Sequence, residues 1–245
     1  RDTDRSRGLG DVYKRQLIIL GVTALITNVA IQKTTFKYEI PYMLLITAVL
    51  LVMGMTGNEI TFIEGVILWI LFIAYLLYLY ILAKKGNDSS DEQSVKLYPV
   101  WKCLLFIVLG GVCVVIGSQF VVNGATTIAR ACGMSERFIG LTIVAFGTSL
   151  PELVTSVSAA RKGNAGIAIG NIVGSNIFNI LFVVGTVALI CPVPFESRFV
   201  IDTVVAILCG VLLWGGTIRH KELRKPCGVV MLLCYAAYFV YLAAM

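Results

Sequence analysis

The sequence is divided into eight long apolar runs separated by short polar segments. A helix that crosses the hydrocarbon core of a bilayer needs about 20 apolar residues, and only segments that pair their own backbone groups are stable there. The runs therefore predict an all-α integral membrane protein with about eight transmembrane helices. We place the predicted spans at residues 17–31, 40–57, 61–83, 101–122, 138–160, 166–190, 199–218 and 227–245.

The composition excludes other classes of protein. Hydrophobic residues make up 58% of the chain and charged residues 14%, and the mean hydropathy is +0.88. A soluble domain usually carries about 25% charged residues, so these values exclude a disordered chain and an ordinary water-soluble enzyme. The net charge of +6 does not indicate a nucleic-acid partner, because the basic residues lie in short loops between the apolar runs.

Two polar segments set the predicted domain boundaries. Residues 1–16 carry eight charged residues in sixteen positions and have no apolar stretch of their own. We interpret them as a non-native head, an artefact, and exclude them from the predicted fold. Residues 84–100 form a polar linker, which separates residues 17–83, with three spans, from residues 101–245, with five.

The distribution of Lys and Arg predicts the orientation in the membrane. Loops on one side of the predicted spans hold eleven of these residues, whereas loops on the other side hold three. The excess of basic residues marks the cytoplasmic side. The linker 84–100 is therefore predicted to be cytoplasmic and the C-terminus to lie outside.

An internal repeat links the front and the back of the chain. Leu17–Ile31 and Leu181–Phe195 are identical at six of fifteen positions, and a shift of one residue then aligns Glu39 with Asp202. Chance similarity is an alternative in Leu-rich sequence. If the match is real, residues 101–245 are a five-helix repeat, residues 17–83 are the remnant of an incomplete first repeat, and roughly 80 residues of that repeat lie upstream. An odd number of helices inverts the second copy in the membrane, as in many transporters.

The span 138–160 carries the most informative chemistry. Its only charged residue is Glu152, and a carboxylate at this depth costs at least ~2.5–3.5 kcal/mol unless it faces a cavity or a partner. Pro151 cannot donate a hydrogen bond to the Gly147 carbonyl, so the helix loosens there. Thr148, Ser149, Glu152 and the freed carbonyl are oxygen donors, which Na⁺ and Ca²⁺ prefer. The alternative is a kinked packing helix whose glutamate pairs with a buried base.

The next span, 166–190, is uncharged and has polar residues on one face. Asn171, Ser175 and Asn179 repeat every four residues, and Gly166, Gly170 and Gly174 repeat in the same way, which predicts close helix approach. In the site interpretation, Ser175 and Asn179 turn their oxygens toward the ions bound by Glu152. In the alternative, these side chains form hydrogen bonds between packed helices.

Two motifs carry a resemblance to a known family. GTSLPE at 147–152 followed by GSNIFN at 174–179 resembles the second alpha-repeat of the cation/calcium exchanger superfamily, and the chain is similar to prokaryotic sodium/calcium antiporters. The resemblance implies two inverted five-helix repeats that exchange several Na⁺ for Ca²⁺. It also implies a ligand set of six residues: Glu152, Thr148 and Ser149 through side chains, Ala145 through its carbonyl, and Ser175 and Asn179 from the next helix.

The expected function is therefore Na⁺/Ca²⁺ antiport by alternating access in a bacterial inner membrane, with the ions as cargo and no cofactor. This chain is expected to hold half of the site, and helices of the missing first repeat are expected to supply the rest. The potassium-dependent branch commonly has Asp at the place of Asn179, which argues against K⁺ co-transport. Alternatives are a Ca²⁺/H⁺ antiporter and a non-transporting membrane fragment. An enzyme is not expected, since the chain has no G-x-S-x-G motif and no P-loop.

Three further features predict structural roles. Glu64 and Asp202 lie near the ends of predicted spans and are expected to be interfacial. Trp69, with the tyrosines that follow it on the same span, is expected to pack against lipid or at the membrane interface.

Overall fold

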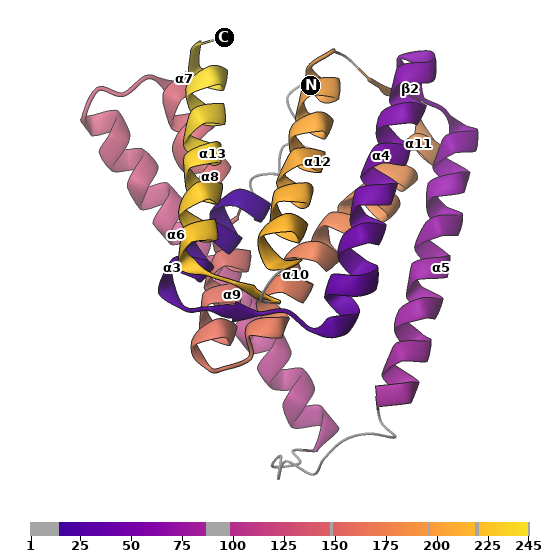
Figure 1. Ribbon diagram of the computed structural model, residues 1–245. Helices are drawn as coiled ribbons and strands as arrows, with labels where there is room; N and C mark the ends of the chain where they lie inside the picture. The colour runs from indigo at the N-terminus through magenta and orange to yellow at the C-terminus, as the bar shows by residue number, and fades with distance from the viewer. Residues whose placement is uncertain (1–14, 87–98, 148, 196, 219–220, 245) are drawn as a thin grey trace. The chain divides into compact units, whose positions relative to one another are not determined.

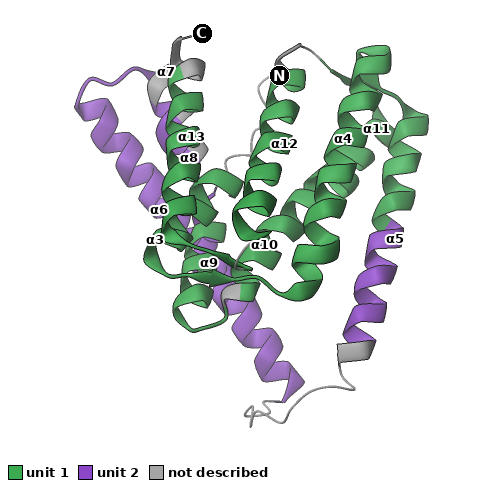
Figure 2. Ribbon diagram, in the orientation of Figure 1, with its two compact units in different colours: residues 1–72, 152–245 green, residues 73–151 purple. Residues whose placement is uncertain are grey.

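The structure, a computed structural model, describes residues 15–86, 99–147, 149–195, 197–218 and 221–244. These residues are mostly helical (Figure 1). They form two compact units, of which unit 1 contains residues 1–72 and 152–245 and unit 2 contains residues 73–151 (Figure 2). Most of the predicted head and linker, residues 1–14 and 87–98, lies outside the described residues.

Unit 1 contains both ends of the chain. Its front elements are η1 (Arg15–Ile19), α3 (Leu20–Ile26), β1 (Val29–Ala30), η2 (Thr35–Glu39), α4 (Ile40–Gly57), β2 (Glu59–Ile60) and the first part of α5 (Phe62–Gly86). Its back elements are most of α9 (Leu150–Arg161), α10 (Ala165–Phe178), η5 (Asn179–Val184), α11 (Gly185–Ile190), β3 (Val193–Pro194), α12 (Ser197–Ile218), β4 (Glu222–Leu223) and α13 (Lys225–Ala244). The η segments are π-helical turns.

Unit 2 contains the end of α5 and a set of shorter helices packed on one long helix. The remaining elements are α6 (Val100–Ala131), α7 (Glu136–Ile139), η4 (Gly140–Val144) and α8 (Ala145–Gly147). Helix α6 packs against η4, α7 and α8. Most of its apolar side chains are exposed, as a lipid-facing surface requires.

Five helical segments of the described chain are long and apolar enough to cross a membrane: Thr35–Gly57, Phe62–Lys84, Val100–Ala131, Gly166–Ile190 and Phe199–Ile218. Two shorter apolar helices, Gln16–Ile26 and Lys225–Val240, correspond to the first and last predicted spans. The predicted span 101–122 continues to Ala131, because Asn123 and the threonines after it remain helical. The predicted span 138–160 is divided into α7, η4, α8 and α9.

Two short antiparallel strand pairs join the front of the chain to its back. β1 pairs with β4, with Val29 opposite Leu223, and β2 pairs with β3, with Ile60 opposite Val193. The pairs lie at opposite ends of unit 1 (Figure 1). Each pair is extended by one equivalent backbone hydrogen bond: Ile31 N donates to Lys221 O over 2.9 Å, and Phe195 N donates to Asn58 O over 2.7 Å.

Two helix crossings in unit 1 are also equivalent. A methyl group on Gly228 of α13 would lie 2.8 Å from the Gly21 carbonyl oxygen of α3 and 2.9 Å from the Ala24 methyl group. A methyl group on Gly65 of α5 would lie 3.1 Å from the Gly185 carbonyl oxygen of α11 and 3.0 Å from the Ala188 methyl group. Only glycine permits this backbone approach at both crossings.

These correspondences confirm the predicted inverted repeat. Gly21 and Gly185, and Ala24 and Ala188, are the residue pairs that the sequence match had aligned. The core of unit 1 lies between the copies, where α4 packs against α12 and α3 packs against α13. Its largest fully buried side chains come mainly from the front copy, among them Leu17, Ile19, Leu20, Ile40, Met43, Ile46 and Leu50.

Candidate functional site

The predicted site helix is broken at the GTSLPE motif. Helix α8 ends at Gly147 and α9 begins at Leu150, and Thr148 lies outside the described residues. Pro151 is the second residue of α9, where a missing N–H leaves no hydrogen bond unmade. The sequence had predicted a loosened turn in one continuous helix, but proline and glycine instead separate two helices.

The break places Glu152 in the first turn of α9. Its side chain is half-buried. The free N–H groups and the positive end of the helix dipole stabilise a carboxylate at this position. Glu152 therefore lies where the start of a helix offers N–H groups to an acceptor within an otherwise apolar segment.

Ser149 lies in the connection between the two helices. Its backbone N–H donates to the Phe146 carbonyl over 3.0 Å. The side chain is 2% exposed, and its Oγ has no hydrogen-bond partner in the described part of the chain. A buried hydroxyl without a partner is costly, and it is the kind of oxygen that a desolvated cation can use.

Gly147 has a packing role in addition to its place in the motif. A side-chain carbon on Gly147 would overlap the Val122 side chain of α6. The glycine thus lets the end of α8 lie directly against α6 within unit 2. We attribute its presence to this close contact as well as to the loss of the helix bond at Pro151.

The second motif spans the end of α10 and the start of η5. Ser175 is half-buried, and its hydroxyl donates to the Ile172 carbonyl over 3.0 Å, which leaves the Oγ lone pairs able to accept. Asn179, also half-buried, is the first residue of η5. The equivalent position of the front copy is likewise π-helical, in η1. Single π-helical turns are frequent at functional sites.

Asn176, between these two residues, was not among the predicted site residues. It is fully buried, its Nδ2 lies 3.8 Å from Met43 Sδ of α4, and its Oδ1 has no partner among the described residues. Gln16 donates to the same sulfur over 3.2 Å. The four-residue spacing in the sequence placed Asn171 on the polar face of the helix and left Asn176 out of it. In the structure Asn171 is exposed and Asn176 is buried.

The two units divide the predicted ligands. Ala145 and Ser149 belong to unit 2, whereas Glu152, Ser175 and Asn179 belong to unit 1. No three His, Cys, Asp or Glu side chains come together in a metal-binding group within the described ranges. The predicted ligands themselves are one carboxylate together with hydroxyl, amide and carbonyl oxygens, which are donor types that suit Na⁺ and Ca²⁺ better than zinc.

The comparison with known proteins identifies the family. The model of the family described as sodium/calcium exchanger protein matches residues 15–81 and 102–244. The chain belongs to this family. Sodium/calcium exchanger MaX1 of Methanosarcina acetivorans is 38% identical over 142 residues, which are 58% of this chain and 41% of that protein. Inner membrane protein YrbG of Escherichia coli is 31% identical over 252 residues, which cover 94% of this chain and 74% of YrbG.

Solved structures of an exchanger share the fold. The sodium-calcium exchanger NCX_Mj, soaked with zero Na⁺ and Ca²⁺, superposes with a TM-score of 0.78 at 30% identity over 97% of this chain and 75% of that chain. The same exchanger soaked with 10 mM Na⁺ and zero Ca²⁺ gives a TM-score of 0.77 at 31% identity. The resemblance stated from the two motifs is thereby confirmed at the level of family and fold.

Other carboxylates of this sodium/calcium exchanger family member have structural partners. Glu64 Oε2 accepts hydrogen bonds from the N–H of Thr61, over 2.7 Å, and from its Oγ1, over 2.9 Å, and so caps the start of α5. Asp202 of α12 accepts a hydrogen bond from the Tyr238 hydroxyl of α13. These contacts give both residues local roles in helix capping and helix pairing.

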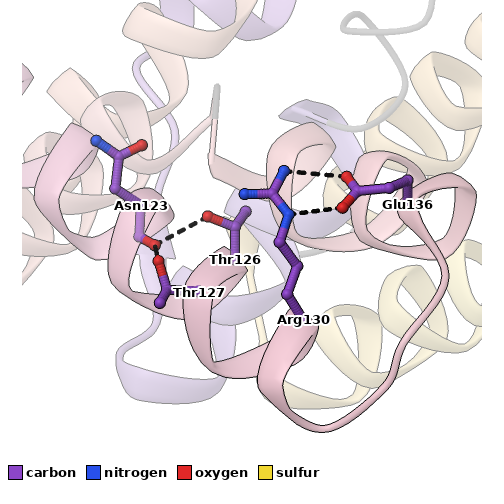
Figure 3. A network of polar contacts seen from close by, with 5 residues as sticks. All are labelled: Asn123, Thr126, Thr127, Arg130 and Glu136. Carbon is purple, nitrogen blue, oxygen red and sulfur yellow. Dashed lines mark hydrogen bonds and ion pairs between the residues drawn. The ribbon is translucent and has the colours of Figure 1, made fainter.

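A set of polar contacts lies at the C-terminal end of α6 in unit 2 (Figure 3). The Asn123 carbonyl accepts hydrogen bonds from the hydroxyls of Thr126 and Thr127. Arg130 pairs with Glu136 through two bonds of 2.6 and 3.0 Å, across the turn that leads into α7. The hydrogen bond from Arg130 lowers the pKa of the exposed Glu136 carboxyl below its usual value. The Arg130–Glu136 pair thus links the end of α6 to the start of α7.

Proposed function

We propose that this protein exchanges Na⁺ for Ca²⁺ across a membrane as a secondary active transporter that works by alternating access. The observation that carries the proposal is the position of Glu152, in the first turn of α9 directly after the break in an apolar segment. Membership of the sodium/calcium exchanger protein family supports the same activity, as do the exchangers MaX1 and NCX_Mj among its relatives.

The proposed ion ligands are the six residues of the two motifs. Glu152, Thr148 and Ser149 would bind through side-chain oxygens and Ala145 through its carbonyl, while Ser175 and Asn179 would bind from the adjoining helix. A bound cation would neutralise the charge of Glu152 and would be coordinated by the Ser149 Oγ, which has no hydrogen-bond partner among the described residues. Both contacts would lower the free-energy cost of burying these two groups. An amide in place of a carboxylate at Asn179 reduces the negative charge and argues against K⁺ as a third ion.

The proposal includes a second set of ligands from the first repeat of the same protein. Inverted repeats place their sites near the midplane, between the copies. The counterparts of the two motifs would come from helices that precede α3 in the natural protein. We further propose that the protein lies in a bacterial inner membrane, with the linker after α5 in the cytoplasm and the C-terminus outside, and that it needs no cofactor.

The direct test is Na⁺-driven uptake of ⁴⁵Ca²⁺ into proteoliposomes that contain the natural protein with its first-repeat helices. Glu152→Gln keeps the size of the side chain and removes its charge, so uptake should fall to the level of empty vesicles. Glu64→Gln is the matched control, because Glu64 caps α5 and should leave uptake within about twofold of wild type. Wild-type uptake by the Glu152→Gln protein would remove this residue from the mechanism.

Two arms of the same assay separate the alternative functions. Replacing the Na⁺ gradient by a pH gradient should abolish uptake, whereas a Ca²⁺/H⁺ antiporter would retain it. The chain of 245 residues alone should show little uptake compared with the protein that includes the first-repeat helices. Equal uptake by both would show that one set of ligands suffices.

A further inference from the structure

We infer that an aromatic cluster on α5 holds the π-helical turn that carries Asn179, and that Trp69 is a positioning residue for the ion site. The inference rests on the proposed function, because Asn179 matters in this way only if it binds an ion. The cluster consists of Trp69 and Phe72 on α5, with Phe178 and Phe182 on either side of Asn179.

The two phenylalanines form one face of the turn. The rings of Phe178 and Phe182 stack with centroids 4.6 Å apart and planes at 21°. Asn179, as the first residue of η5, lies between them in the chain. Contacts to this face of the turn therefore position it, and Asn179 with it, against a neighbouring helix.

Helix α5 provides those contacts. The Phe72 ring lies 5.9 Å from that of Phe178 and 5.4 Å from that of Phe182, and the Trp69 ring lies 5.2 Å from that of Phe182. Offset and edge-on arrangements at these distances are favourable for aromatic rings. In addition, Trp69 Nε1 donates to Thr186 Oγ1 over 3.2 Å, which ties α5 to the first turn of α11.

The backbone approach beneath the cluster is close enough to make these contacts specific. A methyl group on Gly185 would lie 3.2 Å from Leu68 Cβ and 3.3 Å from Trp69 Cδ1. The indole therefore sits directly over the glycine that follows η5. The hydrogen bond from Trp69 to Thr186 holds the C-terminal end of the π-helical turn. The rings of Trp69 and Phe72 contact its side.

The equivalent crossing shows that the close backbone approach does not require the indole or its hydrogen bond. Leu232 of α13 stands at the place of Trp69, Val22 of α3 at that of Thr186, and Ile18 at that of Phe182. Tyr235 of α13 keeps an aromatic ring at the place of Phe72. Leu232 contacts Gly21 without a hydrogen bond. Since the two backbones cross in the same way, the indole, its hydrogen bond and the Phe182 ring are additional features of the crossing that carries Asn179.

The first experiment measures transport by the natural protein with two substitutions that remove the same hydrogen bond. Trp69→Phe loses the indole N–H, and Thr186→Val loses the hydroxyl. Each should raise the KM for Na⁺ or Ca²⁺ about fivefold or more and leave the maximal rate within about twofold, and the double variant should resemble either single variant. Trp214→Phe in α12, a tryptophan outside the cluster, is the control and should leave both constants unchanged.

The second experiment does not depend on transport. Hydrogen exchange at residues 179–184, followed by mass spectrometry of the full chain, should be faster in Trp69→Phe and in Thr186→Val than in wild type, with no change at residues 205–213 of α12. Faster exchange in both variants of a natural protein that shows no Na⁺-driven uptake would keep the contact between α5 and the turn and reject the proposed function. Unchanged exchange and unchanged KM in both variants would overturn the inference. Thr186→Val still decides the matter if Trp69→Phe does not fold.

Discussion

The crossing of α5 with α11 and the crossing of α13 with α3 have equivalent backbones and different side chains. At both, a pair of glycines and one alanine allow the helices to touch. At the first crossing, the Trp69 indole lies on the contact and donates a hydrogen bond across it, whereas at the second Leu232 lies in the equivalent position. The comparison shows that small residues determine how closely the helices of the two copies approach. The side chains around the contact can differ where one copy has a further role.

The largest expected effect comes from filling the glycine contacts. Gly228→Ala should lower the free energy of unfolding by about 2–3 kcal/mol, because the new methyl group meets a backbone oxygen at 2.8 Å that cannot move away. Gly65→Ala should cost about 1 kcal/mol, since the corresponding distance is 3.1 Å. Thermal unfolding in detergent measures both. Gly215→Ala, with open space around it, is the control, and equal losses at Gly228 and Gly65 would contradict the comparison.

The next prediction separates the contributions of the backbone and of a side chain to the contact between α13 and α3. In Gly21→Ala, the methyl group would lie 2.8 Å from Leu232 Cγ, so we expect a loss of about 1–2 kcal/mol. Shortening the neighbour in Gly21→Ala/Leu232→Ala should recover part of the unfolding temperature relative to the sum of the single variants. Additive losses would show that the Gly228 carbonyl, 3.2 Å from the methyl group, is the real obstacle.

A smaller effect is expected where the strand pairs begin. Asn58 and Lys221 occupy equivalent positions with φ of 56° and 52°, in the left-handed region. Asn adopts this region more readily than Lys. Lys221→Asn should therefore stabilise the protein by up to about 1 kcal/mol, and Asn58→Lys should destabilise it by a similar amount. Lys33→Asn controls for the lost charge, and an identical gain from it would refute the conformational explanation.

The smallest effect concerns the polar network of unit 2, which has no counterpart described in the front copy. The pKa of Glu136 is lowered by the hydrogen bond from Arg130, so the pair stabilises the fold above the usual carboxyl pKa and loses this contribution as the pH falls through the lowered value. Glu136→Gln should slightly lower the unfolding temperature at pH 7, and its difference from wild type should shrink as the pH falls below the usual carboxyl pKa. A difference that persists in acid would assign the effect to helix capping.

Much of the fold could be predicted because membrane helices follow from apolar length. The repeat was visible because Gly21 and Gly185 are needed for equivalent contacts and so occur in equivalent sequence. The strand pairs could not be predicted, since two residues are too few to show alternation. The close approach predicted at Gly170 and Gly174 is not found, because a methyl group at either would meet no atom of the described chain within 4 Å.

The candidate site was predicted in its residues more than in its geometry. Glu152 is the only charged residue in an apolar run. The cost of burying such a charge in a membrane can be recognised from the sequence alone. The start of a new helix at Leu150 was harder to predict, because Pro151 is compatible with a kink as well as with a helix start. The burial of Asn176 and the hydrogen bond of Trp69 depend on α4 and α11, which are distant in sequence.

The strand pairs between the front and the back of the chain suggest a way in which such a fold could arise. β1 and β2 find their partners in the other copy, and so do the glycine faces of α3 and α5. One ancestral copy by itself would leave every one of these edges open. Two identical chains inserted in opposite directions would close all of these edges together.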